Sequence, residues 1–273
     1  MTSKRRPRLV SWFSCGTASA VNTKLAIRAY AATHDIVVAR CLVPEEHPDN
    51  DRFAADCSAW FGYPIKNLRS SEYLSCEDVW TRRRYMAGPG GAICTVEMKK
   101  VVRHTFEREW KPDVQAFGYT ADETLRVARF QCQNPEVRLI SLLIEHGLSK
   151  ADCHAMVERA GIALPAMYRL GFANANCIGC VAAQSPGYWN RVRRHFPDVF
   201  RQRAELSRQL GVRLVKGTSG ARERLFLDEL SPTIMGEDGP TPECSLLCAL
   251  AEDTLAERPV DAAMTHATRG DQR

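Results

Sequence analysis

The chain has 273 residues, of which 45% are apolar and 25% charged, and its formal net charge is +5 at pH 7. This composition is typical of a soluble globular protein with one large domain, or one domain plus a smaller attachment. It excludes a membrane-spanning chain, because no apolar run approaches the ~18 residues that a transmembrane helix needs.

The eleven cysteines are odd in number and mostly scattered singly. This is not the even framework of a small secreted scaffold, so we expect a cytoplasmic protein with reduced thiols. Four of them lie in apolar, periodic segments and are expected in the core: Cys41, Cys57, Cys132 and Cys153.

The first elements in the chain are an apolar strand at 9–13, a turn at 14–19 and a helix at 20–32. The turn reads Ser-Cys-Gly-Thr-Ala-Ser. Small and hydroxyl residues at such a turn can bring backbone N–H groups close to a phosphate at a helix N-terminus. The turn therefore suggests nucleotide binding, although many turns carry Gly and Ser only to turn.

The segments that follow alternate between strands and helices. We expect a strand at 35–43, a polar loop at 44–50, a helix at 51–61, a strand at 63–68, a helix at 96–110 and a strand at 112–119. This alternation predicts an α/β fold with a doubly wound, mostly parallel sheet over residues 8–140. Ligands of such sheets bind beyond the carboxyl ends of the strands, where the 14–19 turn lies.

From about residue 141 the pattern changes to helices. A helix at 149–160 begins with a weak capping box formed by Ser149 and Asp152, and a basic helical stretch covers 188–210 with an interruption at Pro197. We expect residues 141–250 to form a helical, cysteine-containing region packed on the sheet, and residues 251–273 to form a flexible tail. The basic stretch is either a solvated helix face or a surface for nucleic acid.

Three cysteine features are candidates for a metal site. Cys177 and Cys180 form a CxxC pair among turn residues, Cys244 and Cys248 form a second pair, and Cys94 lies at the start of a helix after a Gly-rich loop. Thiolates at such spacings can bind one zinc ion or one iron–sulfur cluster. A pair of buried small residues and a dithiol redox pair are the alternatives.

Taken together, these motifs resemble the phosphoadenylyl-sulfate (PAPS) reductase family, within the PP-loop, adenine-nucleotide alpha-hydrolase-like superfamily. The superfamily loop reads approximately Ser-Gly-Gly-x-Asp-Ser; Ser14, Gly16 and Ser19 match it, whereas Cys15 replaces a Gly and Ala18 replaces the Asp. In ATP-splitting members the acidic residue assists pyrophosphate release, so Ala18 favours a substrate that is already activated.

The resemblance also implies roles for residues further along the chain. The nucleotide site would comprise Ser14, Cys15, Gly16, Thr17, Ser19, Glu46, Gly118 and Arg126. Thr95 stands where cluster-containing members have a second Cys beside Cys94. The segment at Cys244 is similar to a C-terminal Glu-Cys-Gly-Leu-His motif whose Cys attacks sulfur, with Ser245 and Leu247 replacing Gly and His.

The implied function is a PAPS reductase-like enzyme of sulfur metabolism. It would bind an adenine nucleotide (PAPS, APS or ATP), with Lys99 and Cys244 as catalytic residues and a thioredoxin-like protein as reductant. Cys94, Cys177, Cys180 and Cys248 would hold a [4Fe–4S] cluster, with zinc as the alternative metal and Cys244 as the alternative ligand.

Two other functions fit the same motifs. The first is a nucleic-acid thiolation enzyme of this fold, which would use the basic stretch at 188–210 to bind tRNA or DNA. The second is a non-catalytic nucleotide- or metal-binding module, which the replacements at Ala18, Ser245 and Leu247 favour.

Overall fold

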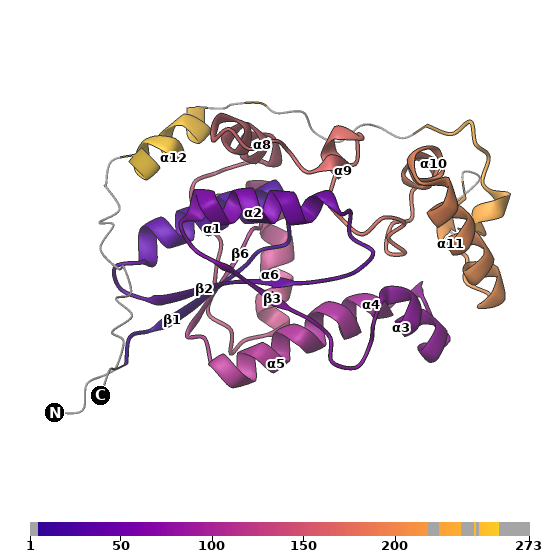
Figure 1. Cartoon of the computed structure of the whole chain (residues 1–273), viewed down its shortest axis with the longest axis horizontal. Helices are drawn as coiled ribbons and strands as arrows, with labels where there is room; N and C mark the ends of the chain where they lie inside the picture. The colour runs from indigo at the N-terminus through magenta and orange to yellow at the C-terminus, as the bar shows by residue number, and fades with distance from the viewer. Residues whose placement is uncertain (1–4, 218–223, 236–242, 244–245, 257–273) are drawn as a thin grey trace, which may run out of the picture.

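A five-stranded parallel sheet forms the centre of the computed structural model, which describes residues 5–217, 224–235, 243 and 246–256 (Figure 1). All neighbouring strands are parallel and run in the order β3-β2-β1-β6-β7. Their bounds are β1 (Arg8–Trp12), β2 (Asp35–Cys41), β3 (Ile65–Leu68), β6 (Val114–Phe117) and β7 (Leu139–Ile140). The predicted α/β fold with a parallel sheet is therefore confirmed.

Helices cover both faces of this sheet, because successive side chains of a strand point to opposite sides. Leu9 packs in one cluster with residues of α1 (Thr17–Tyr30) and α2 (Asp49–Phe61). Val10 packs on the other face against Phe106 of α5 (Val101–Trp110). The sheet is doubly wound, as the alternation of strands and helices predicts.

Three later helices extend the core around α1. They are α7 (Leu142–Glu145), α8 (Lys150–Arg159) and α12 (Leu246–Ala256), and all three contribute residues to the cluster that contains Leu9. The predicted capping box of Ser149 and Asp152 is present at the start of α8. Residues just beyond 140 thus share the core of the sheet, and the predicted domain boundary there stays a prediction.

A second hydrophobic cluster lies beside the sheet. It is built from helices of two sequence ranges, 76–100 and 166–209. It includes residues of α3 (Cys76–Arg83), α4 (Ile93–Thr95), the π-helical turn η1 (Val96–Lys100), α9 (Ala166–Arg169), α10 (Pro186–His195) and α11 (Pro197–Gln209). Pro197 is the first residue of α11, so the predicted interruption is real. Trp189 is fully buried at the centre of this cluster.

The remaining elements are short and lie around these two clusters. They are β4 (Ala87–Gly88), β5 (Gly91–Ala92), η2 (Ala121–Glu123), α6 (Thr124–Gln133), β8 (Val215–Lys216), β9 (Arg224–Leu225) and η3 (Leu227–Glu229). No helix in the described part of the chain is long and apolar enough to cross a membrane.

One core prediction is wrong. Cys57 and Cys153 are buried and Cys41 is half-buried, but Cys132 is exposed. It lies on α6, a helix with no buried residue. The apolar side of α6 does not enter the core. It lies at the edge of a cavity, which Phe130 of this helix lines.

Candidate functional site

The main cavity lies where the strand order of the sheet reverses, between β1 and β6. It has a volume of about 640 Å³, and its lining includes the residues that follow both strands. In open parallel sheets this reversal opens a crevice at the carboxyl ends of the strands. The volume is within the range of small-molecule and cofactor sites.

The 14–19 turn forms one wall of the cavity. Ser14, Gly16, Ala18 and Ser19 line it, whereas Cys15 is buried behind the turn. Cys15 has a φ of 57°, a left-handed conformation that is unfavourable for a residue with a Cβ, and this explains why a glycine suits the position. Burial raises the pKa of Cys15 to about 12, so its thiol is unreactive.

The hydroxyl of Ser19 belongs to the turn itself. It accepts a hydrogen bond from the Ser14 backbone N–H at 3.0 Å and donates one to the Gly16 carbonyl at 2.8 Å. The exposed Ser14 hydroxyl donates to Ser19 Oγ at 3.2 Å, and both serines line the cavity. Gly16 precedes α1 (Thr17–Tyr30), which has no side-chain cap, so the backbone N–H groups of Ala18 and Ser19 in its first turn remain available to an anion.

Two residues brace this turn from behind. The Thr17 hydroxyl lies 2.8 Å from His154 Nδ1, and the Tyr168 hydroxyl accepts hydrogen bonds from the backbone N–H groups of Thr17 and Ala175. Burial lowers the pKa of His154 to about 4, so this imidazole is neutral at pH 7. The Thr17 side chain belongs to this network, and the predicted contact of Thr17 with a nucleotide stays a prediction.

Gly118 brings the second wall close to the first. A Cβ on this residue would lie 2.8 Å from the backbone N and Cα of Ser19. Only a glycine allows the end of β6 to approach the start of α1 so closely. Beyond Gly118, the Arg126 guanidinium donates to Glu123 Oε1 at 2.5 Å. Its Cζ lies 5.2 Å from the centre of the Tyr119 ring.

The third wall is cationic and comes from the helix that follows Cys94. A π-helical turn over Val96–Lys100 interrupts this helix, a feature often found at functional sites. Lys99, Lys100 and Arg103 all line the cavity. The Arg103 side chain is only 14% exposed and lies over the rings of Phe117 and Phe130.

Lys99 connects the cavity to the cysteines. Its Nζ lies 3.2 Å from Oε1 of the buried Glu46, which also bonds Arg40 and Asn50. Partial burial opposes the charge on Lys99, but Cys177 and Glu46 together raise its pKa. Lys99 is therefore a fixed cation between the 14–19 turn and the thiols.

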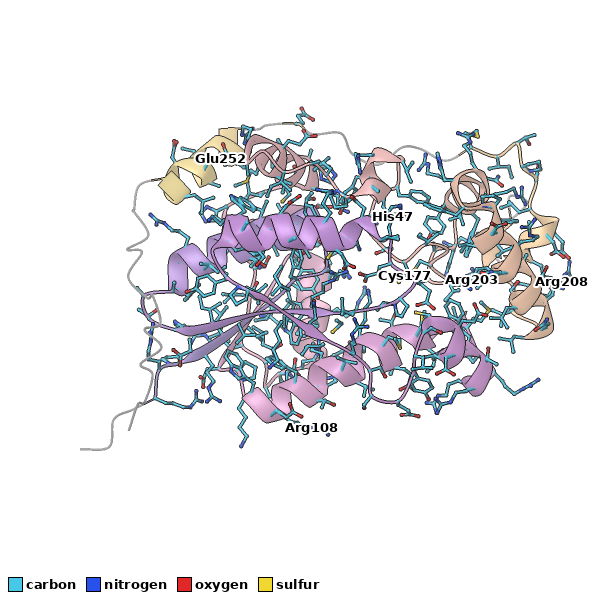
Figure 2. The ribbon with its side chains drawn as sticks, in the orientation of Figure 1. His47, Arg108, Cys177, Arg203, Arg208 and Glu252 are labelled. Atoms are coloured by element: carbon cyan, nitrogen blue, oxygen red, sulfur yellow. The ribbon has the colours of Figure 1, made fainter. Side chains whose placement is uncertain are left out.

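A cluster of thiols lies on the far side of Lys99. The Cys76 thiol hydrogen-bonds to those of Cys94 and Cys177. These bonds lower the pKa of Cys177, and they lower that of Cys94 to about 7, aided by the Trp80 indole N–H and by Lys99. Figure 2 shows Cys177 between the α3–α4 segment and the α10–α11 pair.

The CxxC turn is held by hydrogen bonds at both ends. The Tyr188 hydroxyl accepts from the Cys180 N–H at 2.7 Å and lies 3.3 Å from the Cys177 carbonyl, while the Ile178 N–H donates to the Glu45 carbonyl. Gly179 has a φ of +65°, and a Cβ there would lie 2.9 Å from Val199. Tyr188 therefore positions the cysteines.

The structure brings together only part of the predicted metal set. Cys94, Cys177 and Cys180 gather with Cys76, which the sequence did not single out. Cys248 lies elsewhere, in the core beside α8, with its Sγ 2.6 Å from Arg159. Figure 1 shows α12 and the α10–α11 pair at opposite ends of the long axis. Cys244 lies outside the described residues.

No group of three or more His, Cys, Asp or Glu side chains in the described ranges is positioned to hold a metal ion as it stands. The donor chemistry at the thiol cluster nevertheless fits a soft metal, because buried sulfur atoms gather there beside a cation.

The arginines of the basic stretch have protein partners. Arg193 donates to the carbonyls of Leu227 and Leu230, Arg203 pairs with Glu77, and Arg208 pairs with Asp228 and Glu229. Figure 2 shows Arg203 and Arg208 on α11. Much of the charge that suggested a nucleic-acid surface is thus used to hold α10 and α11 in place.

No family model and no curated protein matches the chain. Among solved structures, PAPS reductase from Candida auris is similar at 12% identity and a TM-score of 0.43, covering 60% of this chain and 78% of that one. The U34-tRNA thiolase NcsA from Methanococcus maripaludis, solved with its [4Fe–4S] cluster, is similar at 14% identity and a TM-score of 0.43, covering 86% and 84%.

Proposed function

We propose that this chain is an enzyme that binds an adenine nucleotide carrying an activated sulfur group, a phosphosulfate, and transfers or reduces that sulfur with a thiol. The observation that carries this proposal is Lys99, which lies between the phosphate-binding turn and the thiol cluster. A phosphosulfate needs both features, because its phosphate requires cations and its sulfur requires a nucleophile.

The residues that line the cavity suit both the phosphate and the base of a nucleotide. The N-terminus of α1 and the Ser14 hydroxyl would bind the phosphate, and Lys99, Arg103 and Arg126 would neutralise it. The aromatic residues Trp12, Phe117 and Phe130 offer rings against which an adenine base could stack. Glu46 would position Lys99 rather than touch the phosphate.

The proposed reaction follows from the chemistry of the substrate. A cysteine thiolate attacks the sulfur, the bond from sulfur to the phosphate oxygen breaks, and the nucleotide leaves with the electron pair. A dithiol of a thioredoxin-like partner then releases sulfite and is oxidised to a disulfide. Cys244 remains the predicted nucleophile.

The thiol cluster supports a metal as part of this site. Cys94, Cys177 and Cys180 would hold it, as predicted from the sequence. A bound zinc ion or iron–sulfur cluster would supply positive charge or electrons close to the sulfur.

Replacing Lys99 by alanine tests the proposal. We expect Lys99→Ala to weaken binding of adenosine phosphosulfate by about 10- to 100-fold, because a charge-assisted hydrogen bond contributes about 1.5–3 kcal/mol. Calorimetric titration measures the affinity, and sulfite release with a small dithiol measures turnover. Lys216→Ala is the matched control, since Lys216 is exposed and does not line the cavity. Equal affinity in Lys99→Ala and the wild type would overturn the proposal.

A further inference from the structure

Cys76 occupies the centre of the thiol cluster. It is the first residue of α3, and its thiol hydrogen-bonds to Cys94, which begins the helix after the Gly-rich loop, and to Cys177, which lies in the loop before α10. These partners are 18 and 101 positions further along the chain. Three separate segments thus converge on one sulfur atom.

Cys180 completes the group. The left-handed Gly179 and the Tyr188 hydroxyl fix the turn that carries Cys177 and Cys180, and both Cys177 and Cys94 lie close enough to Cys180 to affect its charge. The four thiols therefore form one neighbourhood, within the described part of the chain, in which each belongs to a rigid element or a braced turn.

The surroundings of these thiols suit a charged metal–thiolate group. Cys76 and Cys94 are buried in the second hydrophobic cluster, which excludes water. The Trp80 indole N–H is buried beside Cys94 with no other hydrogen-bond partner, and the Lys99 ammonium is close enough to Cys94 and Cys177 to act on their charge. Donors and cations around ligating sulfurs are the usual outer support of thiolate sites.

We propose that Cys76 is the fourth thiolate ligand of a soft-metal site formed with Cys94, Cys177 and Cys180, and that Cys248 is not a ligand. The inference deepens the proposed function and rests on its assignment of a metal to these thiols. Position 95, next to Cys94, is a threonine and cannot supply a sulfur. Cys76 would supply the fourth sulfur instead, from a different segment of the chain.

Metal entry needs proton loss and small movements. Each thiol loses its proton to solvent as a metal–sulfur bond forms, so a divalent ion with four thiolates carries a net charge of −2. Sulfur atoms around a tetrahedral zinc, with bonds of ~2.3 Å, lie about 3.8 Å apart, a separation close to that of hydrogen-bonded thiols. An iron–sulfur cluster binds each cysteine to a different iron and requires the thiols to spread further.

Metal analysis of single serine variants tests the assignment. The full chain is purified anaerobically, and zinc, iron and acid-labile sulfide are measured per chain, without nucleotide. We expect Cys76→Ser to lose most of the metal, as Cys177→Ser does, while Cys248→Ser and the exposed Cys132→Ser keep the wild-type content. Zinc alone identifies a single ion, and iron with sulfide identifies a cluster; either one supports the site.

A second variant separates ligation from folding. Cys76→His keeps a metal ligand at this position, so we expect it to retain zinc or cobalt, with about a quarter less thiolate-to-cobalt absorption than the wild type, since one of four thiolates is gone. Metal loss in Cys248→Ser with retention in Cys76→Ser would overturn the inference. A wild-type chain that lacks metal, or that holds a disulfide at Cys76, would also overturn it. Loss of nucleotide binding with the metal retained would count against the proposed function only.

Discussion

The pKa of each buried cysteine thiol in this protein depends on the groups that surround it. Cys15 and Cys94 are both buried cysteines, yet burial, as the largest cause, raises the pKa of Cys15 to about 12, while the Cys76 hydrogen bond lowers that of Cys94 to about 7. The difference arises from the neighbours and not from the degree of burial. Of these two buried cysteines, only Cys94, in the cluster beside Lys99, therefore has a thiol that ionises readily near neutral pH.

His154 makes the stability of the fold sensitive to acid. Its pKa is about 4 in the folded chain, below the ordinary 6.5, because it is buried. The unfolded chain therefore binds a proton more readily than the folded chain between pH 6.5 and 4, and stability falls as the pH is lowered through this window. We expect a loss of roughly 3 kcal/mol by pH 4, at 1.36 kcal/mol per unit.

Urea unfolding at a series of pH values measures this loss. His154→Asn keeps a polar atom near Thr17 but cannot titrate, so its stability should change less across the same window. His104→Asn, at an exposed position, is the matched control and should behave like the wild type. A pH slope in His154→Asn equal to that of the wild type would show that another group is responsible.

At the level of elements, the site depends on the close approach of two strand ends. The loop after β6 touches the first residues of α1 at Gly118, and this contact sets the distance between the two walls of the cavity. The strand order that creates the crevice also makes these loops neighbours.

Gly118→Ala should therefore damage both the fold and the site. The added methyl would lie 2.8 Å from backbone atoms of Ser19, which cannot move without moving the start of α1. We expect a destabilisation of about 1–3 kcal/mol, as for other overpacked sites, and weaker nucleotide binding in the protein that remains folded. Denaturant unfolding and calorimetric titration measure the two effects.

Gly90→Ala provides the comparison, because nothing lies within 4 Å of the methyl it would add. It should leave both the stability and the nucleotide affinity close to the wild-type values. If Gly118→Ala were as stable as Gly90→Ala, the tight packing of β6 against α1 would not control the site.

Across the whole molecule, the sequence predicted what depends on local pattern. The apolar runs at β1 and β2, the capping box at Ser149 and the break at Pro197 are local signals, and each is present in the structure. The place of Cys76 in the thiol cluster was not predictable in this way, because it depends on contacts across 101 positions and on α3, which no strong periodicity marks. The aromatic partners of Arg103 lie in β6 and α6, so its place in the cavity wall also depends on contacts that local pattern does not reveal.

The thiol cluster also joins segments that lie far apart along the chain. Cys76 and Cys94 belong to segments beside the sheet, and the CxxC turn leads directly into α10 and α11. A metal that binds all four thiols would cross-link these segments, and its binding free energy would add to the stability of the second hydrophobic cluster.

Removal of the metal should therefore loosen α10 before it affects the sheet. After treatment with a chelator, we expect amide hydrogen exchange in Pro186–His195 to accelerate by at least about tenfold, the equivalent of 1.4 kcal/mol in local stability, while β1 and α1 remain protected. The same treatment of Cys76→Ser, which lacks the proposed fourth ligand, should cause little further change. Equal acceleration in β1 and α10 would mean that the metal stabilises the whole fold and does not act as a local cross-link.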